Sequence, residues 1–164
     1  MLISLAIGLV ASLIWVLLLF LTKPRLTVDV TRRRFKMQPA DGWAFIVTNE
    51  SRVTAVQIQA RLWHVTPSKG GYTTRNPVDL KTDTLFQLPG TWASKRRTDA
   101  QRADNTGSNA FRFLTEPPGK RLEDCLSDSD RLLFQVWAQH GFTNFGRAET
   151  FTITKAELLR WTRP

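Results

Sequence analysis

The 164-residue sequence contains few of the side chains on which covalent and metal chemistry depends: one cysteine, two histidines and one tyrosine. Because Cys125 has no partner, the fold cannot rely on an internal disulfide. His64 and His140 lie far from each other and from Cys125 in the sequence, and no flanking pattern groups the three as metal ligands or as a nucleophile with its base. His64 continues the apolar alternation of a strand, which is typical of a structural histidine. We therefore predict that the protein is not an enzyme and that it binds no cofactor and no metal.

Charge is absent from the first 22 residues, and residues 2–21 contain only apolar residues, one glycine and two serines. A helix of that length covers about 30 Å, roughly the hydrocarbon thickness of a bilayer. We predict a transmembrane helix anchor over residues 1–22 and one basic domain over residues 23–164. A cleaved signal peptide is disfavoured, because it would begin with basic residues and end at a small-residue cleavage site.

Positive charge dominates the remainder: all 23 lysines and arginines lie beyond residue 22, against 14 acids in the whole chain. Six of them form a cluster that follows the apolar segment: Lys23, Arg25, Arg32, Arg33, Arg34 and Lys36. We predict that this cluster binds anionic lipid headgroups of the bilayer. By the positive-inside rule it also predicts a single-pass protein of the plasma (inner) membrane with its C-terminal domain in the cytoplasm.

Beyond the apolar segment, hydrophobic residues alternate with the period of two that is typical of strands. We expect strands at 26–31, 43–48, 56–67, 78–80, 84–88, 111–114, 132–139 and 147–154, and a short helix at 155–161. Residues 78–80 and 84–88 are predicted to flank a turn, and residues 89–122 to be largely loop. The pattern predicts an all-β fold, an antiparallel β-sandwich of immunoglobulin-like shape, with a small barrel as the alternative.

Three polar motifs are candidate ligand or modification sites, and each has a simpler explanation. The acidic run Glu123, Asp124, Asp128 and Asp130 lacks the glycine and the spacing of a calcium loop, so residues 127–130 are predicted to form a turn. The Asn49-Glu50-Ser51 triplet matches a glycosylation sequon, which matters only in a secretory lumen. The basic stretch Lys95-Arg96-Arg97 lies in no recognised nucleic-acid-binding motif, so nucleic acid is not an expected partner.

Trp63 and Trp137 fall opposite the main apolar stripes of their strands. They belong either to a second buried layer or to an exposed aromatic patch that binds protein. We predict a membrane-anchored, non-enzymatic interaction module, an accessory or scaffold subunit of a membrane-associated assembly, whose partners are membrane or cytoplasmic proteins. The alternative is a membrane-tethered sensor or effector that binds a small ligand or anionic lipid headgroups. Self-association into a homo-oligomer is left open.

Overall fold

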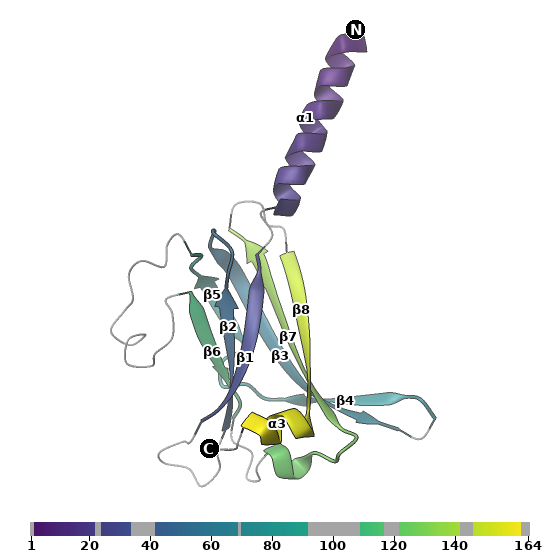
Figure 1. Cartoon of the computed structure of the whole chain (residues 1–164), viewed down its shortest axis with the longest axis vertical. Coiled ribbons are helices and arrows are strands. Elements are labelled where there is room, and N and C mark those ends of the chain that lie inside the picture. Colours follow the sequence, from purple (N-terminus) through teal and green to yellow (C-terminus); the bar gives the residue numbers. More distant parts are fainter. Residues whose placement is uncertain are drawn as a thin grey trace, which may run out of the picture.

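The computed structural model describes residues 2–21, 24–33, 42–68, 70–91, 109–116, 122–141 and 146–161. Its elements are α1 (Leu2–Leu21), β1 (Leu26–Arg33), β2 (Gly42–Asn49), β3 (Ala55–Pro67), β4 (Thr73–Val78), β5 (Thr84–Leu88), β6 (Ala110–Leu114), the 3-10 helix η1 (Leu122–Cys125), β7 (Arg131–His140), β8 (Gly146–Thr154) and α3 (Lys155–Trp161). Strands make up most of the described residues that follow α1 (Figure 1). The predicted all-β fold is therefore confirmed.

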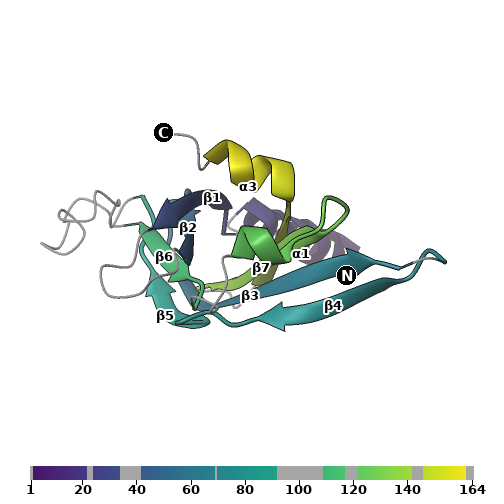
Figure 2. The same ribbon diagram turned by 90° about the horizontal axis from the view of Figure 1, so that it is seen from below.

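The strands form two sheets. One has the order β1-β2-β6, and the other has the order β4-β3-β7-β8, with β5 also paired to β3. Every pairing of named strands is antiparallel. The two sheets face each other (Figure 1, Figure 2), an arrangement that is consistent with a β-sandwich.

The core lies between the sheets and is centred on aromatic rings. Phe45 of β2 stacks on Phe134 of β7, with ring centroids 4.5 Å apart and an interplanar angle of 11°. Phe113 of β6 lies beside the same ring, with centroids 6.1 Å apart. All three are fully buried, as is Trp43. Burying rings of this size supplies much of the hydrophobic free energy that joins two sheets.

A β-bulge in β3 allows two residues that are three positions apart to face the core together. Ala55 and Ile58 are both fully buried although they are three residues apart, which a regular strand with a period of two cannot achieve. The extra residue is Gln57, whose φ of 49° is left-handed, and the register of β3 against β7 shifts between Val56 and Gln59. Bulges of this kind insert one residue and restore alternation beyond it.

The predicted strand at 78–80 is wrong in position and in pairing. β4 runs over Thr73–Val78 and forms a hairpin with β3, in which Pro67 pairs with Thr73. Gly70 and Gly71, with φ values of 126° and 83°, make the tight turn. This hairpin projects from the sheets (Figure 1), so all of β4 except Val78 is exposed and its sequence shows no apolar alternation.

Asn49 is a fully buried polar residue that links the two sheets. Its side-chain amide donates to the carbonyl oxygens of Val53, Leu88 and Pro89 at 2.9, 3.1 and 3.3 Å. Its side-chain oxygen accepts hydrogen bonds from the backbone amide and the hydroxyl of Ser51. The sequon that begins at Asn49 is therefore inaccessible to glycosylation in the folded chain.

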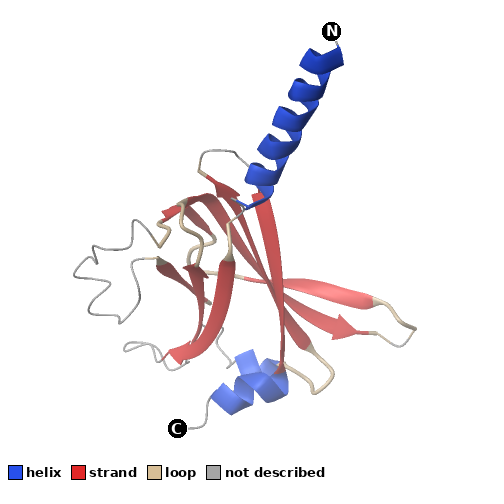
Figure 3. Ribbon diagram, turned by 45° about the horizontal axis from the view of Figure 1, so that its top comes forward, coloured by secondary structure: helices blue, strands red, loops and turns tan. Residues whose placement is uncertain are grey.

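α3 closes one end of the sheets, opposite the end that α1 leaves (Figure 3). The Glu157 side chain accepts a hydrogen bond from the Thr154 backbone amide at 2.8 Å, and the Glu157 amide donates to the Thr154 hydroxyl at 3.3 Å. This reciprocal pair is a capping box, which starts the helix where β8 ends. Leu158 is fully buried and fixes α3 to the core. The predicted helix at 155–161 is confirmed.

α1 is the predicted membrane span, and here the sequence prediction is corrected. The helix runs over Leu2–Leu21, and its described side chains, those of residues 3–18, are all exposed. Among the described residues, no helix is long and apolar enough to cross a membrane. That finding contradicts the predicted single-pass location in the plasma membrane with a cytoplasmic domain.

The Asn49 linkage yields a prediction about stability. Asn49→Ala should lower the free energy of unfolding by about 2–4 kcal/mol, because three carbonyl oxygens lose their donor in a buried site. Asn76→Ala, at an exposed position on β4, is the matched control and should change it by less than about 0.5 kcal/mol. Urea unfolding followed by tryptophan fluorescence measures both. Equal effects of the two substitutions would show that Asn49 does not hold the sheets together.

Candidate interaction face

Trp63 on β3 and Trp137 on β7 lie on the same side of the five-stranded sheet, the side turned away from the core. The register pairs Trp63 with Leu133 and Trp137 with Gln59. All four positions alternate with buried residues of their strands, and both tryptophans are half-buried. The structure thus leaves both indoles partly exposed and brings the two predicted protein-binding residues onto one surface.

We call this side the outer face. It consists of Gln59, Arg61, Trp63 and Val65 on β3, Arg75 and Pro77 on β4, Arg131, Leu133, Gln135, Trp137 and Gln139 on β7, and Gly146, Ala148, Thr150 and Thr152 on β8. These described positions include three arginines and neither aspartate nor glutamate. The outer face is therefore both aromatic and positively charged.

Trp137 is held in place by a glycine on the neighbouring strand. A Cβ atom at Gly146 would lie 2.9 Å from the indole Nε1 and 3.1 Å from Cε2 and Cζ2 of Trp137. The ring therefore lies directly over the Gly146 backbone. An aromatic ring packed on a glycine of the adjacent strand stabilises a sheet edge, and it also restricts the motion of the ring.

A pocket of about 270 Å³ opens beside Trp63. It lies where β3 changes partner, because β4 pairs with residues 62–67 of β3 and β5 pairs with residues 55–59. The connection between β4 and β5 crosses this gap, and the Ala60 amide donates to the Asp83 carbonyl at 2.7 Å. The pocket combines apolar and charged groups, and its lining includes Arg61, Trp63, Pro77, Leu80, Asp79 and Asp83.

Two further exposed aromatics were not singled out by sequence reasoning. Phe86 on β5 is 79% exposed, and Tyr72 in the turn between β3 and β4 is 80% exposed. Phe86 lies between the inward residues Leu85 and Leu88, whose three-residue spacing follows the bulge in β3. The signal that could have found it is this odd spacing of two apolar residues around a third.

The structure describes only part of the predicted anion-binding cluster. Arg25 is exposed and precedes the first residue of β1, whereas the backbone places Arg32 and Arg33 at the last two positions of that strand. Seven residues of extended strand separate the two groups by about 23 Å. Lys23, Arg34 and Lys36 lie outside the described residues, as does the stretch Lys95-Arg96-Arg97.

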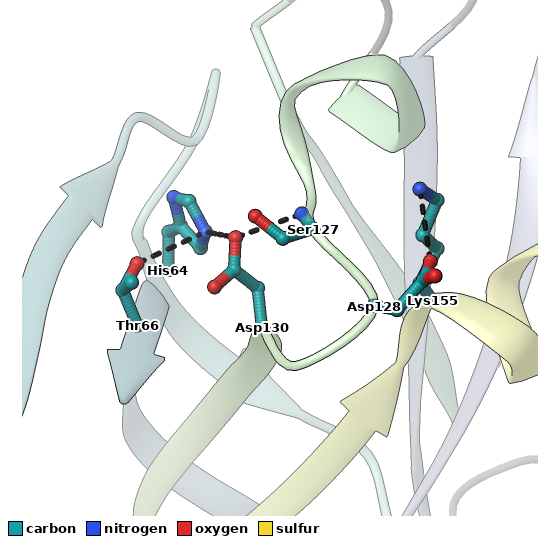
Figure 4. Close-up of polar contacts among 6 residues, drawn as sticks. All are labelled: His64, Thr66, Ser127, Asp128, Asp130 and Lys155. Carbon is teal, nitrogen blue, oxygen red and sulfur yellow. Dashed lines mark hydrogen bonds and ion pairs between the residues drawn. The ribbon is translucent and has the colours of Figure 1, made fainter. Parts of the chain in front are cut away.

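His64 is hydrogen-bonded within the fold, as expected of a structural histidine (Figure 4). Its Nε2 atom lies 3.0 Å from Oδ2 of the buried Asp130 and 3.5 Å from the Thr66 hydroxyl. In a catalytic relay the acid and the nucleophile contact opposite ring nitrogens, whereas here both partners share Nε2. The same Asp130 oxygen accepts the Ser127 backbone amide at 2.8 Å, which closes the turn predicted at residues 127–130.

The other candidate chemical groups remain apart. His140 is buried at the end of β7, and burial lowers the pKa of its imidazole. Cys125 is exposed in η1, and Asp128 pairs with Lys155 at 3.2 Å. Within the described ranges, no three His, Cys, Asp or Glu side chains are grouped so that they could hold a metal ion.

The Asp130 network yields a pH-dependent prediction. Burial alone would raise the pKa of the Asp130 carboxyl, but hydrogen bonds from Ser127 and His64 outweigh it, and the pKa lies below its ordinary 3.8. A lowered pKa adds stability that is complete above the unfolded-state value and is lost as the pH falls through the folded-state value. Asp130→Asn should therefore lower the free energy of unfolding by about 1–3 kcal/mol at neutral pH. The difference in free energy of unfolding between D130N and the wild type should shrink in strong acid, because the Asp130 carboxylate is then protonated in the wild type.

Urea unfolding across the acidic range measures this difference. Asp128→Asn is the matched control, because the Asp128 side chain is 97% exposed, and it should follow the wild-type curve. A D130N difference that stays constant down to strongly acidic pH would contradict the assigned role of the carboxylate.

A functional inference for this chain therefore rests on the geometry of the outer face. Searches of protein-family models and of curated proteins return no match to this chain.

Proposed function

We propose that this chain is a non-enzymatic interaction module, an immunoglobulin-like β-sandwich that binds another protein through its outer face. In this role it serves as an accessory or scaffold subunit of a larger assembly. The observation that carries the proposal is the pair of half-buried tryptophans on one sheet surface, since tryptophan is the residue most enriched among binding hot spots. An interface core is typically depleted of acidic residues and enriched in aromatics and arginine, and the outer face has that composition.

The surroundings of the two tryptophans support binding. Cross-strand pairing puts Pro77, Trp63 and Leu133 side by side across three strands, so Trp63 lies at the centre of an apolar row. Trp137 lies two rows further along β7, where it pairs with Gln59. A fixed aromatic ring with apolar neighbours can be desolvated by a partner at little entropic cost.

The polar groups support the non-enzymatic part of the proposal. Among the described residues, His64 uses one ring nitrogen for both of its side-chain contacts, and His140 is buried. A base needs hydrogen-bond reach to the proton it removes and a second group that orients it.

The proposal is tested by a double variant of the outer face. Trp63→Ser with Trp137→Ser should reduce recovery of co-purifying partners from the native cells at least about ten-fold, because hot-spot tryptophans contribute about 2 kcal/mol or more each. Tyr72→Ser, which removes a more exposed aromatic elsewhere, is the control and should leave recovery unchanged. Quantitative mass spectrometry of the purified chain measures recovery.

A second variant separates a binding defect from misfolding. Gly146→Ala places a methyl group against the Trp137 ring, so the ring must shift while both tryptophans remain. It should weaken recovery of the same partners, while the circular dichroism spectrum shows that the chain remains folded. Unchanged recovery in a folded double-serine variant would remove the outer face from the proposed function.

A further inference from the structure

The arginines of the outer face flank the Trp63 row on both sides. Cross-strand pairing aligns Arg75, Val65 and Arg131 in one row. The next row holds Pro77, Trp63 and Leu133, and the row after that pairs Arg61 with Gln135. Neighbouring rows on one face are two residues apart, or about 7 Å along the strand. The apolar Trp63 row is therefore bordered by positive charge within about one Debye length at physiological salt.

Acidic groups lie at one end of this arrangement. Asp79 and Asp83 line the pocket beside Trp63, whereas the outer-face positions on β3, β4, β7 and β8 include no carboxylate. A ligand that places carboxylates near Arg75 and Arg131 gains charge complementarity, and it avoids like charges if a neutral side chain enters the pocket.

We propose that the outer face binds an extended acidic segment of the partner protein, a refinement that rests on the proposed function. Apolar side chains of the segment pack against the row of Trp63, Leu133 and Pro77. Its carboxylates pair with Arg61, Arg75 and Arg131. Guanidinium groups match carboxylates with two parallel hydrogen bonds, so these pairs set the position of the segment as well as its affinity.

The size of the face favours a segment over a folded domain. The part of the outer face that carries its arginines and tryptophans extends from the Arg131 row to the Trp137 row, where six residues of strand measure about 20 Å and four neighbouring strands span about 14 Å. This area is well below the roughly 800 Å² per partner of an interface between two folded proteins. It matches an extended chain of about six residues.

The aliphatic side chains distinguish a protein segment from nucleic acid. Single-stranded nucleic acid would stack bases on open aromatic rings and place phosphates on arginine. Val65, Pro77 and Leu133 would then face groups that offer little apolar surface, and both indoles are already half-buried. A segment with both apolar and acidic side chains complements all of these residues.

The test uses synthetic peptides and the full chain, kept in a neutral detergent because α1 exposes apolar side chains. The probe is a labelled ten-residue peptide that alternates Glu with Leu, and a Gln-Leu peptide is its neutral counterpart. Fluorescence anisotropy should show that the Glu-Leu peptide binds at least ten-fold more tightly. Added salt should weaken its binding and leave the Gln-Leu peptide little changed.

Two triple variants with equal charge change locate the binding. R61Q, R75Q and R131Q together should weaken binding of the Glu-Leu peptide at least ten-fold. The matched control replaces Arg25, Arg147 and Arg160, which are exposed outside the outer face, and it should leave binding within two-fold of the wild type. Equal losses in both triple variants, or equal affinity for the two peptides, would overturn the inference.

A labelled oligouridine provides the competing outcome. If it binds more tightly than the Glu-Leu peptide and depends on the same three arginines, the occupant is nucleic acid and the inference is wrong. If the peptide fails while the double-serine variant still loses its native partner, the proposed function stands and only the acidic segment is excluded. If neither binding depends on the outer face, both proposals fall.

Discussion

The stacked rings of Phe45 and Phe134 join the two sheets. Because both rings point inward, they determine which residues of their strands point outward. Their centroids lie 4.5 Å apart in the middle of the core. Because side chains alternate along a strand, an inward Phe134 requires an outward Leu133 and an outward Trp137. On β3 the inward Leu62 pairs with Phe134, which turns Trp63 outward. The outer face is thus a direct consequence of how the core packs.

This dependence makes register the critical property of the fold. A slip of one residue would carry both tryptophans into the core and expose the phenylalanines. Gln57 prevents the mismatch that the burial of Ala55 and Ile58 would otherwise create, since it adds one residue at the bulge. Asn49 fixes the same end of the core, because its amide connects β2 to the carbonyl oxygens that end β5. Gln57 and Asn49 thus keep the apolar side chains of these strands turned toward the core.

Alternation in the sequence predicted most strands, because their buried residues recur with a period of two. It failed for β4, whose residues meet solvent on nearly every side and therefore carry no apolar signal. The half-burial of Trp63 and Trp137 could not be predicted, since alternation shows which side of a strand faces the core and not what covers the other side. Phe86 was missed because a bulge breaks the period that would have revealed it.

Stability and recognition are largely separable in this fold, because they use opposite sides of the same strands. Polar substitutions at Arg61 or Arg131 change an exposed surface, whereas changes at Leu62 or Leu132 would open the core. Trp137 joins the two roles, since its ring packs on the Gly146 backbone. A ring that is already ordered by its own sheet loses little entropy when a partner covers its remaining surface. Half-burial is therefore the property that suits this tryptophan to anchor a partner.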